Sequence, residues 1–298
     1  MRKIDYFELG ATLYIPIMNK NLELILKREK YPFLKSVVVC FEDSTKSCDV
    51  LNGIKRLEKI LKWYKVTNLK LFIRPRNIEN LKTLLKLKNI SLIDGFALPK
   101  FDTKNINNYL SIFLYENHFY FMPILETDEV FSLKKLNSIL MELLPFRQKV
   151  LSIRVGGEDI LSCLHTIRDC KKSIYEIMPL YLVLSNIINT FKPRGFNISS
   201  LVYGCFDDFK TLKRELLNDI EHQLFNKTSI HPKQIKIIEN SYKVLNDEVI
   251  IANKLLFENN AIFSFNGRMY EKTTHSNWAE NILKRYKNYG IREETDDK

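Results

Sequence analysis

Short runs of apolar and β-branched residues recur along the chain. Eight of them stand out, at residues 10–17, 36–42, 69–75, 95–101, 118–126, 149–155, 200–205 and 227–232. Most of these runs are continuously hydrophobic rather than alternating, which is typical of parallel strands that are buried on both faces. The pattern therefore predicts a buried parallel sheet.

Amphipathic stretches with the spacing of helices lie between these runs, for example VLNGIKRLEKILKWY and DDFKTLKRELLNDIEHQLF. Strand alternating with helix eight times is the pattern of a (β/α)₈ TIM barrel, whose usual size of roughly 250 residues fits this chain. The alternative is an open doubly wound sheet, which needs fewer strands and often carries a glycine-rich phosphate loop; no such loop is found. We predict an α/β TIM barrel, with residues 1–258 as the catalytic domain and residues 259–298 as a C-terminal helical extension.

The composition fits one enzyme-sized globular domain, because 45% of its 298 residues are apolar. No apolar run approaches the roughly 18 residues that a membrane helix needs, and MRKIDYFELG has no signal-peptide core. We therefore expect a cytoplasmic protein without a membrane partner. The five cysteines are odd in number and form no C-x-x-C motif, so neither a disulfide framework nor a zinc site is expected.

The formal net charge of +11 admits either a nucleic-acid partner or an anionic substrate. Lys and Arg are spread through nearly every predicted helix and are mixed with Asp and Glu. No basic run is interleaved with aromatic residues, as it is in proteins that bind single strands. The charge therefore favours a small anionic acid, or its thioester, over nucleic acid.

Acidic residues stand at the ends of three predicted strands. Glu42 and Asp43 follow SVVVC, Glu126 ends FMPILE, and Asp159 follows RVGGE. In a TIM barrel the carboxyl ends of the strands meet at the rim that carries the active site. Carboxylates gathered there form a hard, oxygen-rich site suited to Mg²⁺. We therefore predict a metal site at Glu126 and Asp159.

The motifs FED, RPRN, LPK, ILET, GGED, IHPKQ and NGRMYEKTTH follow one another in this order. Their order and spacing resemble the citrate lyase beta-subunit-like branch of the HpcH/HpaI aldolase superfamily, from about residue 10 to about residue 285. Together with GATLYIP, the last motif most resembles the carbon–carbon bond lyase-like TIM-barrel proteins encoded in stress (tellurium) resistance clusters. The resemblance implies a metal-dependent lyase or aldolase.

The resemblance also implies roles for the acidic residues. Glu126 and Asp159 match the residues that bind the divalent metal, which is Mg²⁺, with Mn²⁺ as the other option. Glu42 and Asp43 match the pair that holds metal-bound waters. The metal acts as a Lewis acid that stabilises the enolate formed when the carbon–carbon bond breaks.

Basic and polar residues complete the implied site. Arg74 matches the arginine that grips a substrate carboxylate and stabilises the enolate oxygen, and Arg76 is its competitor two residues later. Because Arg74 ends the apolar run, we expect it at the rim, contributing to anion binding rather than to folding. Lys100 is either a substrate-binding residue or a structural lysine at the rim, and Thr127 follows the metal-binding Glu as a further substrate contact. His275 lies in the tail, where a lid histidine would serve as an acid or base.

The same tail predicts an oligomer. Residues 266–285 combine a loop with an amphipathic helix that presents Trp278, Ile282 and Leu283. An eight-stranded barrel has no internal place for this element, so it covers the mouth of its own barrel or of a neighbour's. We expect a homo-oligomer, as a dimer, trimer or hexamer.

Two departures from the family limit the functional prediction. Gly10-Ala11 stands where the family has an Arg-Ser pair that contacts substrate, and Cys40 stands where it has an Asp near the metal. Whether the acid is a coenzyme A thioester is therefore left open, whereas the two metal ligands are retained. We predict a Mg²⁺-dependent carbon–carbon lyase for a small oxo or hydroxy acid or its thioester. The alternatives are a thioester hydrolase on the same scaffold and a non-catalytic barrel subunit of a larger complex.

Overall fold

The computed structural model describes residues 2–43, 45–116 and 118–293. Its contacts divide the chain into two compact units, Met1–Ile235 and Lys236–Lys298. The first unit contains the sheet and the helices around it, and the second contains two helices and a hairpin.

The first unit is built on a parallel sheet of seven strands in the order β6-β5-β4-β3-β2-β1-β7. The strands are β1 (Ala11–Pro16), β2 (Ser36–Cys40), β3 (Lys70–Arg74), β4 (Gly95–Leu98), β5 (Tyr120–Leu125), β6 (Arg154–Val155) and β7 (Lys227–Ser229). They coincide with seven of the eight apolar runs. In β2 the three consecutive valines are fully buried, as expected for a strand covered on both faces.

A short segment at residues 197–200 closes the sheet between β6 and β7. Ile198 forms a parallel bridge with Ile153, and Ser200 forms one with Lys227. The backbone N–H of Ser199 donates to the Ile153 carbonyl at 2.8 Å. The eighth strand position is thus filled, and the TIM barrel is confirmed. The predicted run at 200–205, the seventh along the chain, was placed too late, because the backbone pairs before Leu201 and then turns into a loop.

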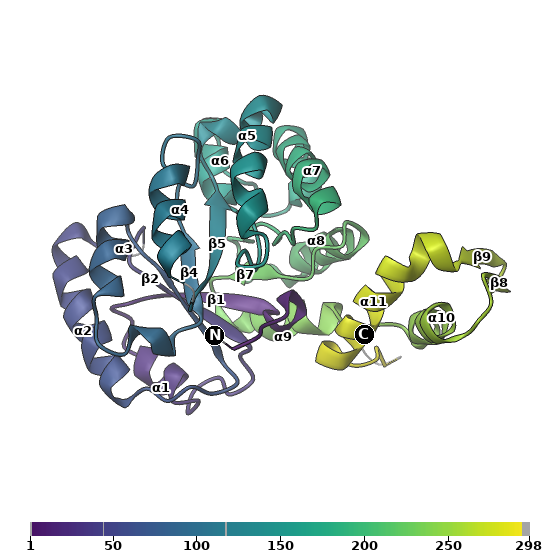
Figure 1. Ribbon diagram of the computed structural model, residues 1–298, viewed down its shortest axis with the longest axis horizontal. Coiled ribbons are helices and arrows are strands. Elements are labelled where there is room, and N and C mark those ends of the chain that lie inside the picture. Colours follow the sequence, from purple (N-terminus) through teal and green to yellow (C-terminus); the bar gives the residue numbers. More distant parts are fainter. Residues whose placement is uncertain (1, 44, 117, 294–298) are drawn as a thin grey trace. The chain divides into compact units, whose positions relative to one another are not determined.

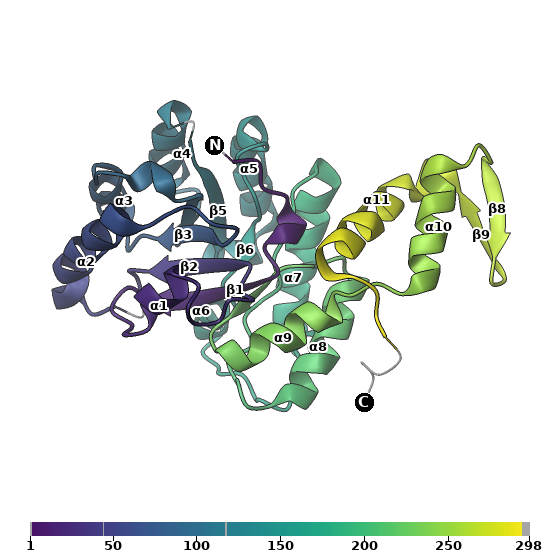
Figure 2. The ribbon, with the colours of Figure 1, turned by 90° about the horizontal axis from the view of Figure 1, so that it is seen from below.

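Helices lie outside the strands of this unit (Figures 1 and 2). They are α1 (Leu22–Leu26), α2 (Val50–Trp63), α3 (Ile78–Leu85), α4 (Ile106–Tyr115), α5 (Leu133–Leu143), α6 (Gly157–Cys163), α7 (Met178–Phe191), α8 (Phe209–Glu221) and α9 (Pro232–Ser241), the last of which runs into the second unit. Side-chain caps set several of their starts. Asn77 accepts a hydrogen bond from the N–H of Asn80 at α3, and Asp208 accepts one from Thr211 at α8.

A buried charge cluster lies at the amino end of β7, away from the rim. The Lys227 ammonium is fully buried and lies 2.8 Å from Glu215 and 2.9 Å from Asp219. Arg168 forms a further ion pair with Glu215. Burial alone would raise the pKa of Glu215, but Lys227 and Arg168 outweigh it and lower that pKa. Four charges that compensate one another thus tie α8 to β7.

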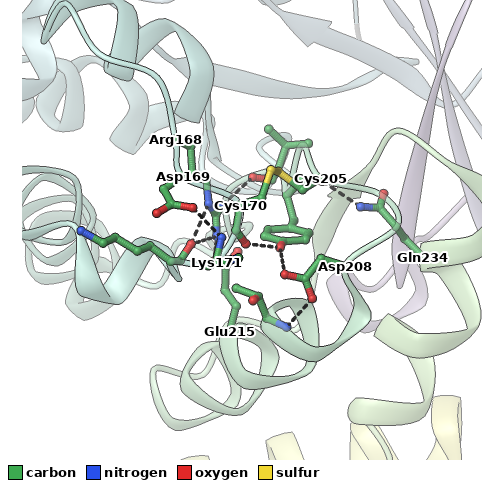
Figure 3. The surroundings of a disulfide bond; sticks show 12 residues. Arg168, Asp169, Cys170, Lys171, Cys205, Asp208, Glu215 and Gln234 are labelled. Carbon is green, nitrogen blue, oxygen red and sulfur yellow. Dashed lines mark hydrogen bonds and ion pairs between the residues drawn. A yellow bond between two sulfur atoms is a disulfide. The ribbon is translucent and has the colours of Figure 1, made fainter.

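A disulfide joins Cys170, in the loop after α6, to Cys205, in the loop before α8 (Figure 3). Their Cα atoms lie 5.6 Å apart. The hydroxyl of Tyr203 donates to the Cys170 carbonyl at 2.6 Å and so holds the same two loops together. The expectation that the cysteines form no disulfide is wrong for this pair. A separation of 35 residues in the sequence gives no sign that two loops of a barrel rim meet.

The second unit consists of α10 (Asn246–Phe257), a hairpin of β8 (Ile262–Phe265) and β9 (Arg268–Glu271), and α11 (Lys272–Tyr289). Asn266 and Gly267 both have positive φ values, of 46° and 76°, as a two-residue turn of type I′ requires. Its core contains Val244, Ile251, Ala252, Leu255, Tyr270, Ala279 and Ile282. The predicted boundary at residue 258 falls inside this unit, between α10 and β8. The roles predicted for the tail as a lid and in oligomerisation stay predictions.

Candidate active site

The carboxyl ends of the strands surround a cavity of about 380 Å³. Residues from β1, β2, β3, β5, β6 and β7, and from segments that follow several of these strands, line it. Among them are Tyr14, Asp43, Arg74, Glu126, Arg154 and Asp159. The predicted rim therefore exists, and most of the predicted charged residues face it.

Glu126 and Asp159 reach this cavity from neighbouring strands. Glu126 directly follows β5 and is only 3% exposed, whereas Asp159 lies in the first turn of α6, after β6. Gly156 makes room for the glutamate, because a Cβ at position 156 would lie 2.4 Å from both Cβ and Oε2 of Glu126. Position 156, which lies between Glu126 and Asp159 in the sequence, therefore favours a residue without a Cβ atom.

Lys100 connects the two carboxylates. Its backbone N–H donates to Glu126 Oε1 at 2.8 Å, its ammonium lies 3.9 Å from the same oxygen, and it forms an ion pair with Asp159. Burial alone would lower the pKa of Lys100, but the hydrogen bond to Asp159 and the charge of Glu126 outweigh it and raise that pKa. Lys100 therefore lies beside both predicted metal ligands, and its role as a substrate-binding or a structural lysine stays a prediction.

Arg74 lies at the end of β3, as expected, and forms ion pairs with three carboxylates. It pairs with Glu42, and its Nη2 lies 3.2 Å from Asp43 and 3.3 Å from Glu126. The side chain lines the cavity, yet the residue is only 8% exposed. The ion pairs predict a contribution of Arg74 to stability, and its role in anion binding stays a prediction.

Burial changes the acidity of these carboxyl groups. It raises the pKa of Glu42 to about 8, although Arg74 opposes the rise. Burial raises the pKa of Glu126 to about 7; Arg74 opposes this rise and the charge of Asp159 adds to it. A further cation bound beside these two groups would favour their ionised forms and so lower both pKa values.

The donor set fits Mg²⁺. Glu126 and Asp159 provide two carboxylates, and the ion tolerates water or substrate oxygens at its other positions. No group of three or more His, Cys, Asp or Glu residues suited to a metal ion occurs in ranges 2–43, 45–116 and 118–293. With Glu126 and Asp159 as its protein ligands, a metal would keep its other positions open for water or substrate oxygens.

Of the predicted substrate contacts, Arg76 and Thr127 lie outside the cavity lining, as Lys100 does. Arg76 donates from Nη1 to the Thr45 carbonyl and from Nη2 to Ser47 Oγ, both at 2.9 Å, so it holds the loop after β2. Thr127 precedes a short 3₁₀ helix, Asp128–Phe131, and its carbonyl accepts a hydrogen bond from Val130. Neither is among the described residues that line the cavity.

His275 belongs to the second unit. Its Nδ1 accepts a hydrogen bond from the N–H of Glu271 at 3.0 Å, at the start of α11. Its role as an acid or base stays a prediction.

Arg154 and Tyr14 also line the cavity, and the sequence reasoning missed both. Arg154 is 2% exposed and donates to Asn226 Oδ1 at 3.0 Å and to Thr228 Oγ1 at 2.6 Å. Its guanidinium lies 5.1 Å from the centre of the Tyr14 ring. Burial raises the pKa of the Tyr14 hydroxyl, so this group remains a neutral donor. The available signal was an arginine inside the apolar run 149–155, where a buried strand should contain none.

A family model decides the relationship of this chain to known proteins. The model, described as a C–C bond lyase of the TIM-barrel fold, matches residues 3–291. The chain belongs to this C–C bond lyase family. The resemblance found in the sequence motifs is thereby confirmed, and the protein is an enzyme of the carbon–carbon lyase class by family.

Solved structures agree with this fold. A citrate lyase from Burkholderia xenovorans LB400 has a TM-score of 0.73 at 14% identity, covering 97% of this chain and 94% of its own. CitE from Mycobacterium tuberculosis has a TM-score of 0.66 at 16% identity, covering 93% of this chain and 97% of its own. RipC from Yersinia pestis has a TM-score of 0.63 at 17% identity, covering 82% of this chain and 100% of its own. The comparison with curated proteins gave no match.

The two departures from the family pattern, at Gly10 and at Cys40, lie at opposite ends of the barrel. Cys40 ends β2 and lines the cavity. Gly10 precedes β1, and its carbonyl accepts a hydrogen bond from Asn226 at 2.5 Å. The change at Gly10 is therefore at the amino end of its strand, whereas the change at Cys40 lies next to the site.

Within the described part of the chain, no helix is both long enough and apolar enough to cross a bilayer.

Proposed function

We propose that the protein is a Mg²⁺-dependent carbon–carbon bond lyase that acts on a small oxo or hydroxy acid or its thioester, by retro-aldol or retro-Claisen cleavage or the reverse condensation. The observation that carries this proposal is the placement of Glu126 and Asp159 on one cavity beside Arg74. The metal bound there would supply Lewis-acid polarisation of the substrate oxygens.

The side chains of the chain itself would hold the substrate. The Arg74 guanidinium has the geometry to bind a carboxylate with two parallel hydrogen bonds and to oppose charge that develops on an enolate oxygen. Because burial raises the pKa of Glu42 to about 8, Glu42 compensates the charge of Arg74 less fully near neutral pH than an ordinary carboxylate would. The Lys100 ammonium would shift away from Glu126 and Asp159 as the metal binds.

Ligands of the related structures support this class of substrate. CitE from M. tuberculosis was solved with magnesium, acetoacetate and coenzyme A, and a citrate lyase beta subunit from the same organism with oxaloacetate and magnesium. We carry over to this chain the metal and the small acid. Assays with an acyl-coenzyme A and with the free acid would decide whether the substrate is a thioester.

Calorimetric titration with Mg²⁺ tests the site. We expect binding by the wild type and a loss of at least about tenfold in affinity, or 1.4 kcal/mol, in Glu126→Gln and in Asp159→Asn. Asp128→Asn is the matched control, since Asp128 is an exposed acid two residues after Glu126 and is not among the described residues that line the cavity. Equal affinity in all four proteins would refute the site and favour a non-catalytic barrel.

A further inference from the structure

Arg154 differs from other buried basic side chains of the barrel in its lack of an acidic partner. Arg74, Arg168 and Lys227 each pair with carboxylates. In contrast, no carboxylate of the described residues lies within 4.0 Å of the Arg154 side-chain nitrogens. Because a buried charge without a counter-charge is costly, this position favours the arrival of an anion.

The hydrogen bonds of Arg154 also leave donors free. A guanidinium has five N–H donors. Nη1 donates to Asn226 and to the sulfur of Met122, and Nη2 donates to Thr228, all neutral acceptors. Nε has no hydrogen-bond partner. The guanidinium is therefore held in place without being saturated.

Tyr14 provides a second donor on the same cavity. Its hydroxyl makes no hydrogen bond with any residue in the described part of the chain, although its ring lies against Arg154. Thr228, which accepts from Arg154, lines the cavity as well. A guanidinium, a free hydroxyl and a threonine thus surround one part of the cavity.

This group lies deeper in the barrel than the residues of the rim. Arg154 is level with the residue two positions before Glu126 on β5. Tyr14 is level with the residue two positions before Arg74 on β3. Two residues along a strand span roughly 6.6 Å, so the depth difference suits a short acid with an anionic group at each end.

We propose that Arg154 and Tyr14 form a second anion-binding subsite that selects substrates with two anionic groups. In this arrangement one carboxylate binds at the rim with Arg74, and the second binds the guanidinium and the hydroxyl below it. The inference rests on the proposed function, because the first anchor is the metal-binding rim. It makes Arg154 the residue that determines specificity for the far end of the substrate.

The test compares acids of equal length that differ only in the far group. The pairs are oxaloacetate with 2-oxobutyrate and 2-oxoglutarate with 2-oxopentanoate, titrated calorimetrically at saturating Mg²⁺. In at least one pair we expect the wild type to bind the dicarboxylate at least about tenfold more tightly. Arg154→Met should remove this preference and leave the affinity for the monocarboxylate unchanged, and Tyr14→Phe should reduce the preference.

Controls separate a binding role from a structural one. Arg56→Met, on α2 and outside the cavity, should keep the preference, and Arg154→Lys should restore part of it. The melting temperature of Arg154→Met should equal or exceed that of the wild type, since an uncompensated charge is removed. If Arg154→Met does not fold, the preference for the dicarboxylate in Tyr14→Phe and in Arg154→Lys tests the subsite instead.

Equal affinity of the wild type for both acids in both pairs would overturn the inference, as would a preference that survives in Arg154→Met. Failure of the wild type to bind any of the four acids would instead refute the proposed function for free oxo acids.

Discussion

Replacing Gly156 by alanine should disturb the metal site through a single added methyl group. The new Cβ would lie 2.4 Å from Cβ and Oε2 of Glu126. Carbon atoms in contact prefer about 3.5–4.0 Å, so the glutamate or its backbone must move by about 1 Å. The backbone φ of Gly156, −86°, is available to alanine, and therefore the effect comes from the contact and not from backbone strain.

A displacement of Glu126 by this amount should affect both stability and metal affinity. It would lengthen the 2.8 Å hydrogen bond from the Lys100 N–H to Glu126 well beyond bonding distance. Overpacking costs about 1–3 kcal/mol of stability, and misplaced support of a ligand typically costs about 10–100-fold in metal affinity. We therefore expect both losses in Gly156→Ala.

Gly157→Ala is the matched control. Its added Cβ would meet the Leu201 side chain at 2.9 Å, so it overpacks the neighbouring apolar contact and leaves Glu126 alone. Urea unfolding should show similar stability losses for the two variants, and Mg²⁺ titration should show a loss mainly in Gly156→Ala. Wild-type Mg²⁺ affinity in Gly156→Ala, or an equal loss in both variants, would refute the reasoning.

Three further predictions concern stability and assembly. Lys227→Met should lower the free energy of unfolding in urea by about 3–5 kcal/mol, because Glu215 and Asp219 would lose their shared cation; a change below about 1 kcal/mol would contradict this. Between the ordinary pKa of 4.5 and its folded value of about 8, Glu42 holds a proton only in the folded state. Without metal, stability should therefore fall as the pH rises through this window, and Glu42→Gln should flatten the slope; equal slopes would exclude Glu42 as the source. Ending the chain after Ser241 removes α10, the hairpin and α11, with the exposed Phe257 and Met269. Light scattering should then show a smaller assembly than for the full chain, whereas a full-length monomer would refute the proposed homo-oligomer.

Local sequence determined the strands and the position of the rim. Continuous apolar runs such as SVVVC become buried strands, because only a buried strand tolerates apolar residues on both faces. Glu126 and Asp159 could be predicted to lie near each other, since the carboxyl ends of parallel strands meet at one rim. Arg74, at the last position of its strand, was likewise placed on the cavity.

Only the tertiary structure decided which side chains contact one another. Arg154 looked like one charge in an apolar run, and its neutral surroundings come from β1 and β7, far away in the sequence. Arg76 lies two residues beyond Arg74, yet it bonds to the loop after β2 because the chain has already left the strand. Contacts of this kind depend on how distant segments approach after the barrel closes, and neither the hydrophobic period nor the order of motifs carries that information.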